Sequence, residues 1–304
     1  HALNSIHACM AGKDVYCAKP MTLTIHEGRV MVKAVRKYKR VFQTGSQQRS
    51  MKETRIGWQL VRNRRLGKIQ MIHGHNYPSP WDQYFPSESV PEGLDWETWC
   101  GMNEVRGYHE DIHRPRAKPG WISLYPYSGG EMTGWGSHGL DMIQWALGMD
   151  ESGPVEVWPE GSRSMICKVR YRYEGNIELR LDNRGPAGGG LFVGDKGTIL
   201  VNRGKYEAKP PEIGKPVHKE GEIELYVSNN HMRNWFDCIR SREKPIADVE
   251  IGHRSATVCH LGNIARWAGR KLQWSPEQER FINDEDANQY LDRPRRDPYK
   301  LPEI

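Results

Sequence analysis

The first 46 residues follow an order of strand, helix and strand that strongly limits the possible folds. An apolar run at residues 14–18 predicts a short strand, residues 24–39 predict a helix, and residues 40–46 predict the next strand. Two strands joined by one helix are expected to lie parallel, with a right-handed crossover. A preceding helix is expected at residues 2–10, because Gly12 stands where a C-terminal glycine is usual.

The rest of the chain predicts a second, larger sheet. Between residues 154 and 227 apolar and polar residues alternate in several runs, the last of which begins at Glu222. This alternation indicates antiparallel or mixed strands with one face covered. Residues 78–120 form a long irregular stretch, typical of a binding lip or a subunit contact. Helices are expected at residues 50–63, 136–150, 231–241 and 252–269. The sequence therefore predicts an α/β (α+β) fold, with a small parallel sheet and a larger, open, mainly antiparallel sheet covered by helices.

Composition excludes several classes of protein. The net charge is +6, but the basic residues are scattered, so nucleic acid is not expected as a partner. The six cysteines lie far apart, without the spacing of a zinc site. No apolar run reaches the roughly 18 residues that a membrane span needs, so no membrane contact is expected. Cytoplasmic location is the default expectation. Because the chain starts in the middle of a pattern, an export signal upstream of His1 stays open.

Six stretches, in the same order along the chain, resemble the Gfo/Idh/MocA family of nicotinamide-dependent sugar and polyol oxidoreductases. They are residues 12–28, 43–50, 90–99, 128–150, 192–204 and 231–265. Members of this family begin with a Rossmann domain that carries a G-x-G-x-x-G turn, which this sequence does not contain. The resemblance therefore implies that roughly 100 residues of a Rossmann domain would lie upstream.

The resemblance also implies a division into two domains. Residues 1–55 correspond to the C-terminal part of a dinucleotide-binding Rossmann-type domain. Residues 56–304 correspond to a substrate-binding and oligomerisation domain whose C-terminal helices pack back on the first. The implied cofactor is NAD or NADP, and the implied partner is a small carbohydrate or polyol. A homo-oligomer, either a dimer or a tetramer, is expected.

The resemblance assigns catalytic roles to three residues, and cofactor contacts to Lys19, Pro20 and Gln47. Lys19 matches the lysine of the family's Glu-Lys-Pro motif, where an ammonium can stabilise negative charge on a substrate oxygen. His138 matches the catalytic histidine, and Asp141, three residues later, could share a helix face with it and orient its ring.

Two positions depart from the family pattern. Ala18 replaces the glutamate of the motif, which removes a partner of the lysine. Gly134 replaces an aspartate four residues before the histidine. Each departure removes a carboxylate that the resemblance would place near Lys19 or His138.

Candidate substrate contacts are mostly aromatic. They are Tyr77, Trp81, Trp121, Tyr125 and His253. In the lip at residues 73–84, strand alternation would place His73 and His75 on one face, where they could contact sugar hydroxyls or bind a metal. No third ligand is evident, so a carbohydrate-binding or structural role is favoured and no metal site is predicted.

Two functions follow from these observations. The first is an NAD(P)-dependent oxidoreductase that acts on a sugar, inositol or glycoside hydroxyl, with lysine and histidine handling the proton. The alternative is a non-catalytic carbohydrate-binding or assembly protein derived from the same family.

Overall fold

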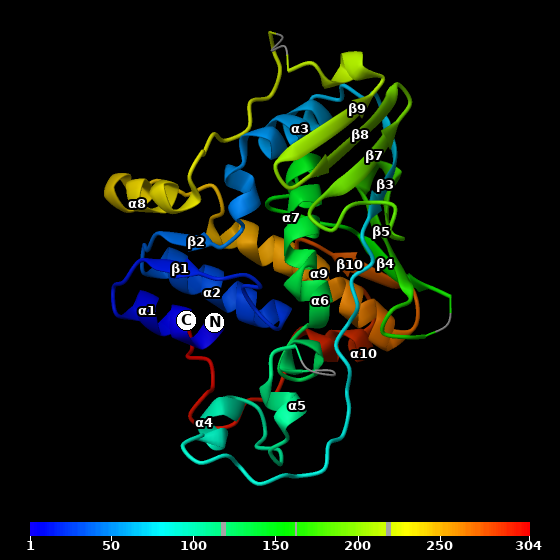
Figure 1. The fold of residues 1–304 in the computed structure, drawn as a ribbon. Helices are drawn as coiled ribbons and strands as arrows, with labels where there is room; N and C mark the ends of the chain where they lie inside the picture. The colour runs from blue at the N-terminus through cyan, green and yellow to red at the C-terminus, as the bar shows by residue number, and fades with distance from the viewer. Residues whose placement is uncertain (117–119, 162, 217–219) are drawn as a thin grey trace.

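Two sheets of unequal size organise the protein (Figure 1). The computed structural model describes residues 1–116, 120–161, 163–216 and 220–304. The smaller sheet has two strands and the larger has nine. This architecture confirms the predicted fold class, a small parallel sheet beside a large, mainly antiparallel one.

The small sheet is the β-α-β unit expected from the sequence. Strand β1 (Val15–Cys17) pairs in parallel with β2 (Phe42–Thr44), and α2 (Ile25–Lys37) connects them. Helix α2 begins after Thr24, whose hydroxyl accepts a hydrogen bond from the backbone N–H of Glu27 at 3.2 Å, which is an N-cap. Helix α1 precedes β1 and shares an apolar core with α2.

The large sheet has the strand order β11-β10-β4-β5-β6-β3-β7-β8-β9. Strands β3 and β6 pair in parallel and the other neighbours are antiparallel. The bounds are β3 Ile69–Gly74, β4 Glu156–Glu160, β5 Lys168–Tyr173, β6 Ile177–Leu181, β7 Gly190–Gly194, β8 Gly197–Asn202, β9 Lys205–Lys209, β10 Leu272–Ser275 and β11 Arg280–Phe281.

Strand β5 shows why one face of this sheet is covered and the other is not. Val169 and Tyr171 point into the core and are fully buried, whereas the alternating Arg170 and Arg172 lie on the opposite, wetter face. There Arg170 pairs with Glu160 at 2.7 Å, across the antiparallel β4–β5 pair.

Three helices cover the inner face, namely α3 (Lys52–Arg62), α7 (Gly136–Leu147) and α9 (Val249–Ala268). Helix α9 also packs on the small sheet, because two glycines permit close approach. A Cβ atom on Gly28 of α2 would lie 2.2 Å from Nδ1 of His253. A Cβ atom on Gly252 would lie 2.1 Å from Oγ1 of Thr44 in β2. Helix α9 therefore joins the two sheets.

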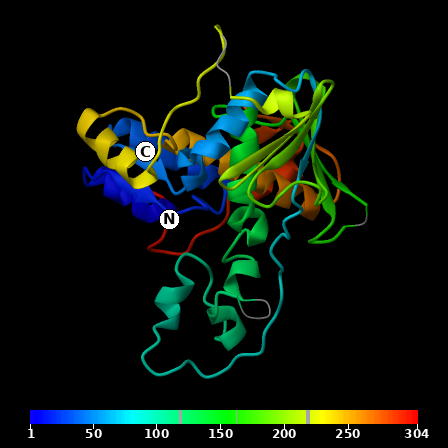
Figure 2. The same ribbon diagram turned by 45° about the horizontal axis from the view of Figure 1, so that its top comes forward.

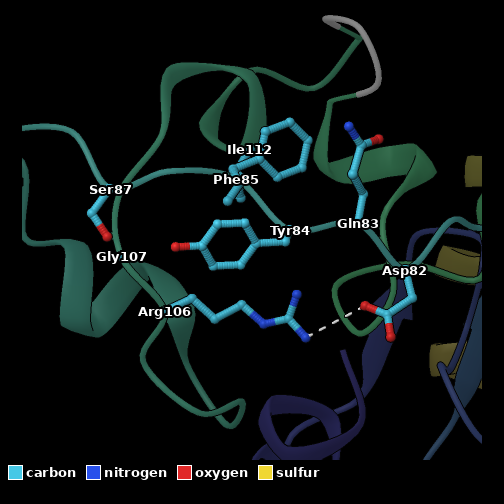
Figure 3. Close-up of a pocket in the computed structure, with 8 residues that line it drawn as sticks. All are labelled: Asp82, Gln83, Tyr84, Phe85, Ser87, Arg106, Gly107 and Ile112. Atoms are coloured by element: carbon cyan, nitrogen blue, oxygen red, sulfur yellow. Dashed lines mark ion pairs between the residues drawn. The ribbon is translucent and has the colours of Figure 1, made fainter.

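Residues 78–116 and 120–128 form an arm that projects from the body in both views (Figures 1 and 2). The arm has an apolar cluster of its own, in which Trp96 and Trp99 stack with ring centroids 4.5 Å apart. A cavity of about 350 Å³ opens beside the highly exposed Tyr84, and an ion pair of 3.8 Å between Arg106 and Asp82 lies at its edge (Figure 3).

The remaining elements are short, apart from α1 and α8. Their bounds are α1 Ala2–Met10, η1 Gln47–Ser50, α4 Trp96–Cys100, α5 Glu110–His113, η2 Trp121–Ser123, α6 Gly130–Gly134, η3 Glu174–Asn176, η4 Pro211–Gly214, α8 His231–Ser241, α10 Glu285–Asn288 and η5 Gln289–Leu291. Within the described ranges, no helix is both long enough and apolar enough to cross a membrane.

The strand predicted from Glu222 onward is wrong. The structure gives these residues no regular secondary structure, because side chains of α3 take their backbone groups. Asn63 accepts a hydrogen bond from the backbone N–H of Ile223 at 2.7 Å and donates to its carbonyl at 2.9 Å. Gln59 accepts from the backbone N–H of Leu225 at 3.3 Å. Helix α9 also begins at Val249, three residues before the expected start.

Candidate active site

Lys19 lies just beyond β1, at the carboxyl edge of the small parallel sheet. The backbone N–H of Gly45, which follows β2, donates to the carbonyl of Cys17 at 2.8 Å and holds the two strand ends together. The Lys19 ammonium Nζ donates to the carbonyl oxygen of Gly134 at 2.7 Å. Lys19 therefore reaches from the small sheet to the end of α6, and it stands where open α/β sheets place their ligands.

The surroundings of Lys19 favour the neutral amine more than water does. Burial lowers the pKa of Lys19, and the nearby carboxylate of Glu131 opposes this effect. The cations Arg203 and Arg116 lower the pKa of Lys19 further. An amine with a lowered pKa can give up and recover a proton closer to neutral pH, as acid/base catalysis requires.

His138 is the third residue of α7 and is almost completely buried. Its ring meets the ring of Trp135 edge to face, with centroids 5.7 Å apart. Nε2 lies 3.5 Å from a guanidinium nitrogen of Arg203, whereas Nδ1 has no hydrogen-bond partner among the described residues. Burial, and then the charges of Lys19 and Arg203, lower the pKa of His138 from 6.5 to about 3. The imidazole is therefore neutral at pH 7.

Asp141 does not orient His138 as the spacing suggested. Its carboxylate accepts hydrogen bonds from the Arg49 guanidinium, the shortest at 2.8 Å, and from the hydroxyl of Ser255 at 2.6 Å. Arg49 also pairs with Asp150 at 2.8 Å. Arg49 and Asp141 are both buried, so this cluster ties α7 to η1 and to α9. No hydrogen bond joins Asp141 to His138 in the part of the chain that the structure describes.

Arg203, in the turn between β8 and β9, is a residue of this site that the sequence reasoning missed. Its Nε donates to Oε1 of Gln48 at 2.9 Å, and its guanidinium lies 5.3 Å from the ring centroid of Trp135. With the amide nitrogen of Gln47 turned towards Gly45, the Gln47 oxygen accepts from Arg203 at 3.1 Å. Gln47, expected to contact the cofactor, thus supports this guanidinium.

A cavity of about 510 Å³ opens beside Lys19 and Pro20. This volume is within the roughly 300–1,000 Å³ of ordinary ligand pockets. Aromatic side chains of the arm form one wall, as expected for Trp121. The lining side chains that matter most are Trp99, Trp121, Tyr127, Asn103, Glu27 and Arg293. Aromatic walls with a few polar groups are typical of ligand pockets, and Lys19 and Pro20, which were expected to contact the cofactor, line this cavity.

The other two aromatic residues predicted on the arm lie near its base but do not line this cavity. Trp81 is half exposed and forms a backbone bridge with Leu124. Tyr125 packs its ring against Trp267, with centroids 5.6 Å apart. Neither Trp81 nor Tyr125 therefore joins Trp121 in lining this cavity.

Two predicted substrate contacts are buried and cannot meet a substrate in this structure. The hydroxyl of Tyr77 donates to the carbonyl of Ala187 at 2.6 Å, and Tyr77 is 2% exposed. His253, inside α9, is 0% exposed, and its Nε2 lies 2.6 Å from the carboxylate of Glu279. The protein itself satisfies the Tyr77 hydroxyl and Nε2 of His253, whereas Nδ1 of His253 is buried without a hydrogen-bond partner among the described residues.

The histidine lip does not form a metal centre. His73 is buried and pairs through Nδ1 with the carboxylate of Asp182 at 2.9 Å, while His75 packs edge to face against Tyr77. Across the described ranges, no group of three His, Cys, Asp or Glu side chains is arranged to hold a metal ion.

Comparisons with known proteins agree with this architecture. The family model described as "Oxidoreductase family, C-terminal alpha/beta domain" matches residues 46–301. The structure of the WlbA dehydrogenase from Bordetella pertussis in complex with NADH and UDP-GlcNAcA is 17% identical, with a TM-score of 0.60, over 90% of this chain and 76% of that one. An NAD-binding protein from Listeria innocua is 15% identical, with a TM-score of 0.57, over 90% and 75%.

A third similar structure is the aldose-aldose oxidoreductase from Caulobacter crescentus complexed with glycerol. It is 16% identical, with a TM-score of 0.52, over 89% of this chain and 75% of that chain. A search of the curated proteins found no match. At these identities the solved structures show the fold, and the family model, which spans most of the sequence, shows the family. The chain belongs to the Gfo/Idh/MocA oxidoreductases.

Proposed function

We propose that this protein is an NAD(P)-dependent oxidoreductase that acts on a hydroxyl of a sugar, inositol or glycoside. The observation that carries the proposal is that the side chain of Lys19 reaches the segment just before His138. Lys19 is bonded to the carbonyl of Gly134, four residues before His138, and its charge acts on the imidazole. Lys19 also lines a cavity of about 510 Å³ that has aromatic side chains in its wall. An amine with a lowered pKa next to a pocket is typical of an acid/base site.

The two side chains would divide the work on the substrate hydroxyl. Nζ of Lys19, as the neutral amine, would take the hydroxyl proton, and the resulting ammonium would stabilise the substrate oxygen. His138 would not accept and hold this proton near neutral pH, because its pKa is about 3. Its neutral ring would instead donate from the unpartnered Nδ1–H to the hydroxyl oxygen and orient the hydroxyl. A bound nicotinamide would supply the hydride acceptor.

Pro20 and the aromatic wall formed by Trp121 and Tyr127 would hold the nicotinamide ring beside Lys19. The NADH and UDP-GlcNAcA in the WlbA complex, and the glycerol in the aldose-aldose oxidoreductase, support a cofactor and substrate of these classes. We further propose a homo-oligomer formed through the charged outer face of the large sheet.

Turnover by a lysine variant tests the proposal. Oxidation of a panel of polyols and sugars with NAD and NADP would be followed by nicotinamide absorbance in the 304-residue chain. With the best substrate, Lys19→Ala should lower kcat roughly 100-fold, because the proton has no acceptor. Lys13→Ala, in an exposed turn after α1, is the matched control and should keep the wild-type rate. Equal rates for wild type and Lys19→Ala would contradict the proposal.

The alternative function is carbohydrate binding without turnover. Ala18 and Gly134 favour it, because neither position offers a carboxylate to the reaction. Calorimetry that detects a bound polyol in a chain with no hydride transfer to NAD or NADP would establish this alternative.

A further inference from the structure

Glu131 is an acidic side chain at the site for which the proposed chemistry gives no role. It lies in α6 and its side chain is 20% exposed. One carboxylate oxygen, Oε1, pairs with the guanidinium of Arg116. The other, Oε2, is buried and has no hydrogen-bond partner within the described part of the chain. A buried carboxylate oxygen without a partner is costly, so it is expected to have a use.

The free oxygen of Glu131 occupies the space beside Gly134. A Cβ atom on Gly134 would lie 2.9 Å from Oε2, closer than real Cβ contacts allow. Within the described ranges, that Cβ would meet no residue other than Glu131 within 4 Å. A residue larger than glycine at 134 would therefore displace the carboxylate, and the two positions are sterically coupled.

The same residue, Gly134, accepts the hydrogen bond from Lys19 through its carbonyl. Glu131 and Lys19 thus both lie against the same residue, Gly134. Around Lys19, Arg203 and Arg116 are cationic, His138 is neutral, and the thiol of Cys259 is buried. Glu131 exerts the strongest influence that favours the charged ammonium.

We propose that Glu131 is the positioning residue of Lys19. The Glu131 carboxylate can lie in the site because residue 134 is glycine and has no side chain. The glutamate keeps the ammonium at the Gly134 carbonyl, in a site where Ala18 and Gly134 supply no carboxylate of their own. The inference rests on the proposed function for its catalytic meaning, but its geometry and its test do not need turnover.

Trace acetylation of the 304-residue chain tests this role. Acetic anhydride reacts with the neutral amine, so the rate of Lys19 acetylation against pH, measured by mass spectrometry of its peptide, gives the apparent pKa. Glu131→Gln removes the charge with little change in shape. It should lower the apparent pKa of Lys19, because the carboxylate that favours the ammonium is gone. Lys13, read from the same digest, is the internal reference. An unchanged Lys19 titration in Glu131→Gln would overturn the proposal.

A relocated carboxylate provides the rescue experiment. Glu131→Ala should lower the Lys19 pKa as Glu131→Gln does, and the double variant Glu131→Ala/Gly134→Asp should restore it, because the new carboxylate enters the vacated space. A double variant that titrates like Glu131→Ala would contradict the coupling. The matched control is Glu110→Ala, which removes a glutamate of the arm that also pairs with an arginine. It should leave the Lys19 titration unchanged.

The two proposals fail in different ways. If Glu131 had only a structural role, its substitution would change the unfolding midpoint and leave the Lys19 titration unchanged. That result would overturn the positioning role. If Glu131→Gln changes the Lys19 titration but the wild-type chain transfers no hydride, the positioning role stands and the proposed function is wrong.

Discussion

Asp141 shows that sequence spacing alone does not assign an acidic residue to a catalytic pair. It lies three residues after His138, which on a helix places both on neighbouring positions of one face. The structure gives its carboxylate to Arg49 and Ser255 instead. A buried arginine needs such a partner more than a neutral imidazole does, because an unpaired charge in the core is costly.

We therefore expect Asp141→Ala to act on stability. The substitution leaves Arg49 buried beside a single remaining carboxylate, and should lower the free energy of unfolding by about 3–5 kcal/mol. Asp150→Ala removes the other partner, whose side chain is 31% exposed, and should cost about 1 kcal/mol. Urea unfolding measures both. Equal losses for the two variants would contradict the account.

Some residues of the site were predicted from the sequence and others were not. Lys19 and Pro20, expected to contact the cofactor, and Trp121, expected to contact the substrate, line one cavity. Glu131 and Arg203 were missed. For Glu131 a signal existed, because it stands three residues before Gly134 and so on the same helical face. The β8–β9 turn brings Arg203 to His138, and local residue spacing does not indicate this contact between distant positions.

At the scale of elements, α9 is unusual because it is buried on nearly every side. It packs on the large sheet, on α7 and on the small sheet. Its polar residues therefore lie in the core, which is why His253, predicted to contact substrate, does not. Among them His260 is 5% exposed, and burial lowers its pKa from 6.5 to about 4.

This burial predicts a pH dependence of stability. Below pH 6.5 the unfolded chain binds a proton at His260, whereas the folded protein does so only near pH 4. Unfolding therefore takes up a proton in this window, and stability is lost as the pH falls from about 6.5 towards 4. From pH 6 to pH 5, wild type should lose about 1 kcal/mol more than His260→Gln in urea unfolding.

The control for this prediction is His7→Gln, because His7 is exposed on α1. That variant should keep the wild-type slope. A slope in His260→Gln as steep as that of wild type would show that this ring does not contribute.

Elements were predicted well where local pattern decides them. The strand, helix and strand of the small sheet and the helix at 231–241 were all expected, because period and caps are local signals. The strand expected from Glu222 was wrong, because alternation does not reveal whether a neighbouring strand exists. There the backbone of Ile223 bonds to Asn63, about 160 positions away in the sequence.

At the scale of the whole molecule, the cavity beside Lys19 is lined by distant parts of the chain. Lys19 and Pro20 come from the small sheet, Trp121 from the arm, and Arg293 from the C-terminal segment. The family resemblance anticipated the lysine and its sheet, but the arm that closes the cavity follows no periodic pattern. Its position is set by tertiary contacts, which one sequence does not display.

We propose that the cavity beside Lys19 serves a nicotinamide cofactor. Calorimetric titration of the 304-residue chain with NADH and with NADPH tests it most directly. We expect one of the two to bind with a Kd of roughly micromolar order, and Pro20→Ala/Trp121→Ala, which opens the cavity wall, to weaken that binding at least tenfold. The absence of any binding heat for either nucleotide, in a chain that is folded by circular dichroism, would contradict the claim.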